Sequence, residues 1–177
     1  GLVVAGHEGA GGVSGAALVS RRRFTGWWEY MIDDALFTAP PRYEHSGAAL
    51  FDGEGRLVGI ASLWVSDALN TGMAFPGNMF VPINLLKDVL PDLAKSGRRR
   101  GDKRPWLGLN TEQLEGNVVV SRVLPDSPAE QAGIQRGDII LGVGGDSIGG
   151  QSEFYESLWS SGAAGSDVTL HIVRDKS

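Results

Sequence analysis

Residues 124–140 constrain the fold more than any other stretch, because they place helix-ending and turn-forming residues at fixed distances from one another. Pro128 lies early in a short helix predicted over 127–133, where its missing N–H costs no hydrogen bond. Gly133 follows at the position where helices commonly end in a left-handed conformation that other side chains resist. Gly137 and Asp138 then turn the chain into a strand predicted over 138–143. The segment is therefore expected to fold as helix, turn and strand.

The elements around this segment complete a small mixed domain. Residues 117–123 predict a strong strand, and residues 168–173, which alternate, predict a last strand. An amphipathic helix is predicted over 153–159, entered through Gly149 and Gly150. The expected fold of this part is therefore α/β.

Residues 124–140, LPDSPAEQAGIQRGDII, resemble the signature PxSPAxxAGxxxGDxI of bacterial PDZ domains. An unrelated helix–turn–strand unit is the alternative. The resemblance implies a PDZ domain over 105–177, with a peptide-binding loop of the form x-Φ-G-Φ that Trp106-Leu107-Gly108-Leu109 matches. It implies that successive N–H groups of this loop bind a peptide's C-terminal carboxylate, while the peptide extends an open sheet edge beside 109–111.

The opposing wall of that groove is expected to be the helix over 153–159. Phe154 and Leu158 are spaced for core packing, whereas Tyr155 or Trp159 is expected to line the groove. The predicted peptide-binding residues are Trp106, Leu107, Gly108, Leu109, Tyr155 and Leu158.

The first half of the chain predicts short strands over 2–5, 16–20, 48–51 and 57–63, and the 26 glycines of the chain favour such a fold. Helical spacing then predicts a helix over 84–96. Asn84 is the expected N-cap, Gly97 lies just past the end, and Pro91 is expected to kink or shorten the helix. Residues 97–104 carry charge and glycine with almost no apolar content, which predicts a basic linker.

Residues 75–85, FPGNMFVPINL, resemble the stretch that closes the second barrel of HtrA-family serine proteases, and GHEG at 6–9 resembles a loop of that family. The family motif GNSGGPL corresponds to EHSGAAL at 44–50. The resemblance places Ser46 at the nucleophile position and Glu44 and Gly47 in the oxyanion loop. It implies a mainly β fold: the C-terminal β-barrel half of a trypsin-like protease over 1–96, the linker 97–104, and the PDZ domain over 105–177.

A nucleophilic serine needs a histidine base and a carboxylate that orients it. In the family both come from a first barrel that these 177 residues do not include, so the chain is expected to be a fragment and inactive alone. His45 is expected not to substitute, because side chains of sequence neighbours point apart. Asp33 and Asp34 are expected in a surface turn. Glu44 replaces a glycine of the motif, and its carboxylate is unfavourable beside a developing oxyanion.

The two resemblances leave two possible functions. The first is an HtrA-like serine endopeptidase of protein quality control that acts on polypeptide substrates, with the PDZ domain binding peptide C-termini. The second is a non-catalytic peptide-binding or scaffold protein derived from a degenerate protease. By resemblance alone, the expected location is the periplasm or cell envelope, and a homo-oligomer is possible in the parent protein.

Composition and spacing argue against several other classes of function. The net charge of −5 argues against a nucleic-acid partner, and the absence of cysteine excludes disulfides and thiolate chemistry. No apolar run approaches the length of a membrane span. His7, His45 and His171 lack metal-ligand spacing, and the glycines of residues 6–15 match no phosphate-binding motif. No cofactor and no metal are expected.

Overall fold

The computed structural model of the chain describes residues 1–7, 9–101 and 103–174. These residues form two compact units. The first comprises Gly1–Phe24 and Ile32–Arg100, and the second comprises Thr25–Met31 and Gly101–Ser177. Three sets of residues in the predicted segments lie outside the described residues: Glu8 of the 6–9 loop, Asp102 of the linker, and 175–177 at the end of the predicted PDZ domain.

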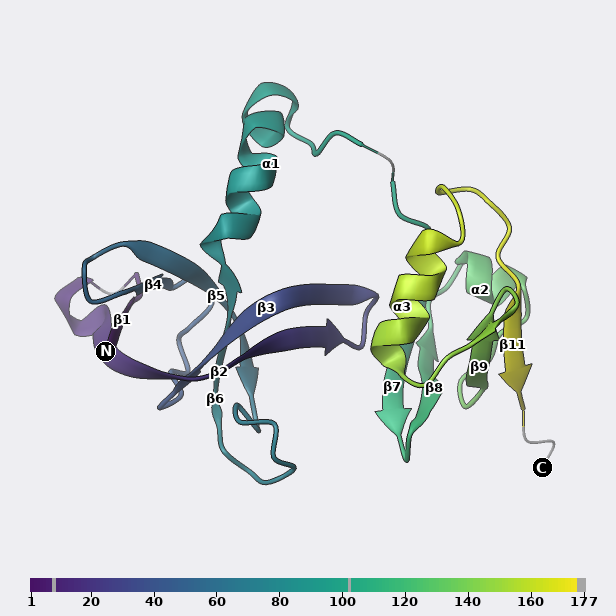
Figure 1. The fold of residues 1–177 in the computed structure, drawn as a ribbon, viewed down its shortest axis with the longest axis horizontal. Coiled ribbons are helices and arrows are strands. Elements are labelled where there is room, and N and C mark those ends of the chain that lie inside the picture. Colours follow the sequence, from purple (N-terminus) through teal and green to yellow (C-terminus); the bar gives the residue numbers. More distant parts are fainter. Residues whose placement is uncertain (8, 102, 175–177) are drawn as a thin grey trace. The chain divides into compact units, whose positions relative to one another are not determined.

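Within the described residues, six strands form a closed barrel in the order β1-β2-β3-β6-β5-β4 (Figure 1). The barrel strands are β1 (Leu2–Ala5), β2 (Val13–Gly26), β3 (Tyr30–Ala39), β4 (Ala49–Phe51), β5 (Leu57–Val65) and β6 (Gly77–Pro82), and a 3₁₀ helix, η1 (Gly9–Gly12), precedes β2. Four of these strands overlap the predicted ones. β3 was not predicted, and β6 falls in the stretch identified by resemblance.

The barrel core includes a cluster of buried side chains that five of its strands contribute. Val4, Leu36, Leu50, Ala61 and Phe80 meet there, each buried, from five of the strands. Closing the sheet on itself pairs the edge strands β1 and β4 with each other. The fold is therefore mainly β, as predicted.

The placement of Asp33 and Asp34 in a surface turn was wrong, since both lie inside β3. The side chains are exposed and pair across the hairpin, Asp33 with Arg23 at 2.7 Å and Asp34 with Arg21 at 3.2 Å. Asp34 also has a φ of 58°, a left-handed conformation that is unusual for a non-glycine residue inside a strand. The turn of this hairpin lies instead between β2 and β3, over 27–29.

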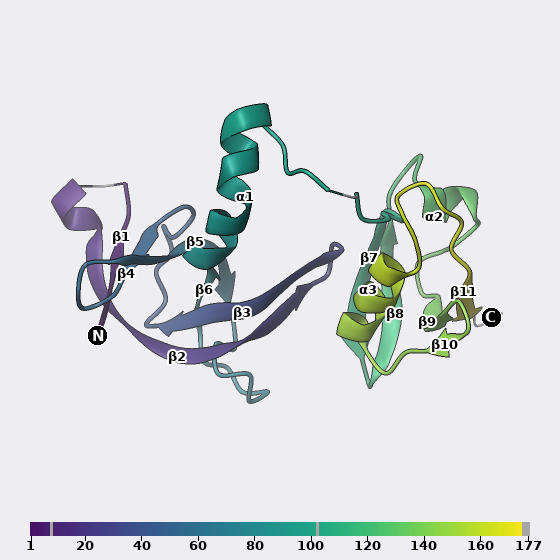
Figure 2. The ribbon, with the colours of Figure 1, turned by 45° about the horizontal axis from the view of Figure 1, so that its top comes forward.

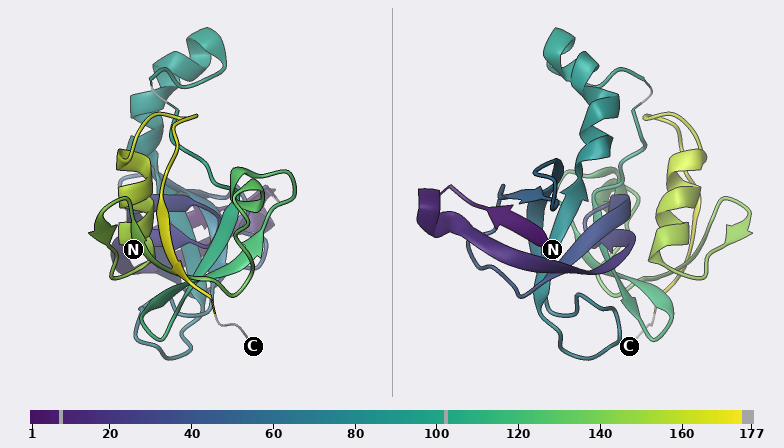
Figure 3. Two further views of the ribbon diagram at one scale, coloured as in Figure 1. Left: turned by 90° about the vertical axis from the view of Figure 1, so that its right-hand side faces the viewer. Right: turned by 60° about the vertical axis from the view of Figure 1, so that its left-hand side comes forward.

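The helix after the barrel, α1 (Ile83–Ser96), extends away from the strands of its own unit (Figure 3). Its end at Gly97 is confirmed, with φ 67° and an N–H bond to the Leu93 carbonyl. The N-cap is Pro82 rather than Asn84, so the helix begins one residue earlier than predicted and has no side-chain cap there. Pro91 does not shorten the helix, which continues to Ser96.

In the second unit, the sheet has the order β10-β9-β8-β7, with β11 also paired to β9; Figure 2 shows β10 beside β9. Its elements are β7 (Leu109–Leu114), β8 (Asn117–Val123), α2 (Pro128–Gln131), β9 (Ile139–Val143), β10 (Asp146–Ser147), α3 (Gln151–Ser160) and β11 (Leu170–Val173). α3 covers the sheet, and Phe154 and Leu158 are fully buried against Leu109, Val120 and Ile140. The predicted core role of Phe154 and Leu158 is confirmed.

α2 is shorter than predicted at both ends, because Ser127 is its N-cap and Ala132 its C-cap. The Ser127 hydroxyl accepts the Glu130 N–H at 3.2 Å, and the Glu130 carboxylate accepts the Asp126 N–H at 2.8 Å. Such reciprocal bonds satisfy N–H groups that the first turn of a helix leaves unpaired. Gly133 has the expected left-handed conformation, with φ 78°.

Candidate functional site

The loop Leu107–Leu109, hereafter the carboxylate loop, owes its shape to Gly108. This residue has φ 78°, and a β-carbon added to it would lie 2.3 Å from the Cβ of Ser127. Conformation and space therefore both require glycine. The carbonyls of Leu107 and Gly108 accept N–H bonds from Ala129 and Leu124, at 3.0 and 2.9 Å. The loop is thus held from one side, and its own N–H groups are left for another partner.

That partner is the side-chain carboxylate of Glu29. Its Oε1 accepts the N–H of Gly108 at 2.8 Å, of Leu109 at 3.1 Å and of Leu107 at 3.2 Å. Three consecutive backbone donors therefore converge on one carboxylate oxygen, the geometry of an anion-binding nest. Burial raises the pKa of Glu29 above its ordinary value, and the three N–H bonds oppose this rise.

The residues that precede Glu29 are hydrogen-bonded to both β7 and α3. The Thr111 N–H donates to the Trp27 carbonyl at 2.8 Å, which is a strand-type bond at the edge of β7. The expectation of an open edge beside 109–111 was therefore wrong for this structure. The sequence could not reveal the occupant, because it lies about eighty positions upstream of the loop.

The predicted helix-side residues divide into two kinds. The Tyr155 hydroxyl bonds to the Glu29 N–H, the Gly26 carbonyl and the Thr111 hydroxyl, at 3.0, 3.2 and 3.0 Å. Burial is the first cause of the raised pKa of this hydroxyl. Leu158 lies in the core, and Trp159 stacks on Tyr155 with ring centroids 5.5 Å apart. Of the residues predicted on α3, only Tyr155 thus bonds to the occupied groove.

Sequence reasoning missed Glu29 and Gln151. The Gln151 amide donates to the Thr111 carbonyl at 2.7 Å and to the Gly26 carbonyl at 3.2 Å, which ties the start of α3 to the edge of β7. The pair Trp27-Trp28 directly before Glu29 is the sequence feature that could have drawn attention to this position.

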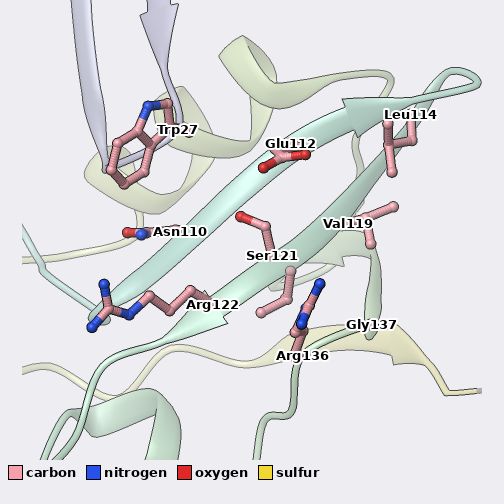
Figure 4. Close-up of a pocket in the computed structure, with 10 residues that line it drawn as sticks. Trp27, Asn110, Glu112, Leu114, Val119, Ser121, Arg122, Arg136 and Gly137 are labelled. Atoms are coloured by element: carbon pink, nitrogen blue, oxygen red, sulfur yellow. The ribbon is translucent and has the colours of Figure 1, made fainter.

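A hollow on the β7–β8 ribbon lies beside this groove. Figure 4 shows Trp27 and Arg122 at the Asn110 end of the hollow and Leu114 at its other end. Trp27 is 53% exposed, so its indole contributes a wall without being enclosed. The exposed Trp106, which directly precedes the carboxylate loop, is not among the residues that line this hollow.

Ser46 lies exposed in the loop that leads into β4. Its neighbour Gly47 has φ 76°, and the Gly47 N–H donates to the Ala61 carbonyl at 3.0 Å. Gly47 therefore shapes the loop, while its own N–H is engaged with β5. Glu44 is exposed, and its carbonyl accepts the Arg42 Nε–H at 3.2 Å.

The buried Asn78 of β6 fixes the approach to Ser46. Its Oδ1 accepts the Arg42 N–H at 2.6 Å and its Nδ2 donates to the Arg42 carbonyl at 3.0 Å. His45 Nδ1 lies 2.8 Å from the Tyr43 carbonyl and 3.1 Å from the Arg42 carbonyl. Because both oxygens only accept, Nδ1 is the protonated nitrogen. Between described residues, no hydrogen bond links Ser46 to a histidine.

Among the described residues, no group of three or more histidine or carboxylate side chains is arranged to hold a metal ion. None of the described helices has the length and hydrophobicity needed to cross a bilayer.

Comparison with known proteins gives consistent relatives. Residues 105–177 match the family model described as PDZ domain. The serine endoprotease DegS of Haemophilus influenzae is 36% identical over 100 residues, which are 55% of this chain and 28% of that protein. The periplasmic serine endoprotease DegP of Escherichia coli is 30% identical over 141 residues, which are 74% of this chain and 29% of that protein. The chain spans less than a third of the length of these relatives.

Solved structures show the same fold. The HtrA-type protease AlgW with tripeptide has a TM-score of 0.56 and 21% identity, covering 99% of this chain and 61% of that chain. The serine endoprotease from Yersinia pestis has a TM-score of 0.53 and 25% identity, covering 99% of this chain and 58% of that chain. A barrel followed by a PDZ domain is thus an arrangement that these proteases share.

Proposed function

Because the chain belongs to the HtrA family of PDZ-bearing serine proteases, we propose that it supplies the nucleophile-bearing barrel and the peptide-binding domain of a serine endopeptidase. Its substrates are polypeptides, in the protein quality control expected of an HtrA-like enzyme, and its PDZ domain binds their C-terminal ends. The relatives reported above are named as proteases, which favours this function over the non-catalytic scaffold.

One observation carries the binding half of the proposal: the carboxylate loop holds a carboxylate. Three N–H groups of Leu107–Leu109 converge on one oxygen at 2.8 to 3.2 Å. A peptide's C-terminal carboxylate offers the same charge and acceptors, and bonds to charged groups contribute roughly 1.5–3 kcal/mol each. The edge of β7 adds a strand-type N–H donor at Thr111, the second element of peptide recognition by strand addition.

The catalytic half of the proposal gives Ser46 the role of nucleophile and the 44–47 loop the role of oxyanion site. The exposed position of Ser46 and the clamp of Asn78 on Arg42 support it. No histidine of the described residues is hydrogen-bonded to Ser46, so the proposal assigns neither the histidine base nor its carboxylate partner to a residue. Glu44 in place of a motif glycine predicts a slow enzyme, because misplacing an oxyanion donor costs about 10²–10³ in rate.

The test of the binding half compares free and amidated peptide C-termini. The probes are fluorescein-labelled octapeptide pools ending in Ala, Val, Leu or Phe, titrated against the full chain and its Glu29→Gly variant. Amidation removes the charge, so the amidated pool is expected to bind at least about tenfold more weakly. Equal binding of the two pools to both proteins would show that the carboxylate loop does not recognise peptide ends.

A further inference from the structure

The segment Thr25–Glu29, hereafter the tip segment, lies along the whole peptide groove. At one end of the tip segment, the Thr25 hydroxyl is 2.6 Å from the Ser152 hydroxyl. At the other end, the Glu29 carboxylate accepts hydrogen bonds from the carboxylate loop. Between them, the Trp27 carbonyl accepts the Thr111 N–H. The tip segment therefore runs antiparallel to β7 and ends at the loop, which is the direction and register of a peptide added to this edge.

Glu29 adopts a conformation that its side chain does not favour. It has φ 53° in the three-residue turn between β2 and β3, where glycine or asparagine is the usual residue. A non-glycine residue in this region costs about 1–2 kcal/mol. Strained residues of this kind persist where the surroundings determine them, and they cluster at ligand clamps. Two sets of hydrogen bonds stabilise Glu29 in this strained conformation: those that its carboxylate accepts from the carboxylate loop, and the one that its N–H donates to the Tyr155 hydroxyl.

We propose that the tip segment is a built-in ligand of the peptide groove, in which the Glu29 side chain takes the place of a peptide's C-terminal carboxylate. An incoming peptide must then displace it. The claim that Glu29 competes with a peptide rests on the proposed peptide binding. The claim that Glu29 docks in the carboxylate loop does not. The apparent affinity for a peptide falls by the fraction of molecules whose groove is open, so a segment docked in about 90–99% of molecules weakens binding about ten- to a hundredfold.

The docking is tested without any peptide, by amide hydrogen exchange measured by NMR on the full chain. Glu29→Gly removes the carboxylate while glycine keeps the left-handed turn. We expect exchange at Leu107, Gly108 and Leu109 to accelerate at least tenfold, and exchange at the core amide of Val120 to stay unchanged. The matched control is Asp33→Ala, which removes a carboxylate from the same hairpin and leaves the loop untouched. Equal exchange of the three loop amides in wild type and Glu29→Gly would overturn the proposal.

The competition is tested with the free-carboxylate octapeptide pool described above. Glu29→Gly is expected to bind it at least tenfold more tightly than wild type, and Asp33→Ala to bind like wild type. Equal affinities of wild type and Glu29→Gly for this pool would overturn the competition. If neither protein binds the pool while the loop amides still respond to Glu29→Gly, the proposed peptide binding fails and the docking of Glu29 stands.

Discussion

At the scale of single residues, the carboxylate loop depends on the missing side chain of Gly108. Gly116, in the turn between β7 and β8, has a similar φ of 83° against 78° for Gly108. A β-carbon on Gly116 would meet nothing within 4 Å, whereas one on Gly108 would overlap Ser127. The two glycines therefore share the conformational requirement, and only Gly108 adds the steric one.

This difference predicts unequal effects of the same substitution. Gly116→Ala is expected to lower the free energy of unfolding by about 1 kcal/mol, the cost of a left-handed alanine. Gly108→Ala adds an overlap that costs about 1–3 kcal/mol more, since Ser127 must move. Urea unfolding followed through β8 and β9 amides by NMR measures both. Equal destabilisation by the two substitutions would show that Ser127 does not confine the loop.

At the scale of elements, an ion pair joins the start of β9 to the end of β11. The fully buried Asp138 carboxylate accepts Arg174 Nε–H at 2.6 Å and Nη2–H at 2.7 Å, and the Gln135 N–H at 2.8 Å. The hydrogen bonds from Arg174 are the first cause of the lowered pKa of Asp138. The motif residue Asp138 thus fastens the last strand to the sheet as well as turning the chain into β9.

The lowered pKa sets the sign of a pH effect. The unfolded chain, with the Asp138 pKa near 3.9, binds more protons in acid than the folded chain, so this stabilisation is present above about pH 4 and is lost as pH falls through the folded pKa. Asp138→Asn is expected to lower the stability of the second unit by roughly 2–3 kcal/mol at pH 7, since Arg174 is 37% exposed and keeps some solvent. In urea unfolding, the difference in the free energy of unfolding between wild type and variant should become smaller as pH falls from about 5 to about 2. A gap that stays constant with pH would contradict the assignment, and the exposed Asp33→Asn is the control.

At the scale of the whole molecule, the proposed nucleophile Ser46 has no hydrogen-bonded histidine among the described residues. Ser46 is exposed, His45 Nδ1 is engaged with carbonyls of its own loop, and no histidine of the described residues bonds to Ser46. Asn78 is hydrogen-bonded to the N–H and the carbonyl of Arg42, four residues before Ser46.

The 177-residue chain is therefore expected to show no turnover of casein or a fluorogenic peptide, because losing a triad member costs on the order of 10⁴–10⁶ in rate. Turnover that Ser46→Ala abolishes would contradict this. A longer form that also carries a histidine–carboxylate pair tests the catalytic half of the proposed function. There, turnover that survives Ser46→Ala would overturn the role of Ser46.

Local chemistry in the sequence determined the features that need only neighbouring residues. Gly97 and Gly133 have the left-handed conformation expected after a helix. The resemblance of residues 124–140 and of the x-Φ-G-Φ pattern to PDZ domains located the carboxylate loop, whose shape depends on Gly108. Such sequence patterns report only on interactions between residues that are close together in the chain. They were wrong at Asn84 and at Asp33-Asp34, where packing and cross-strand pairing set the local conformation instead.

Only the tertiary structure decided what fills the groove. Glu29 and the carboxylate loop are 78 to 80 positions apart, and Asn78 and Arg42 are 36 apart. Contacts of such range leave no period or motif in the sequence, since each residue satisfies a partner that folding alone brings near. The chain's own sequence therefore specified a loop that binds a carboxylate, and the fold supplied the carboxylate from the turn between β2 and β3.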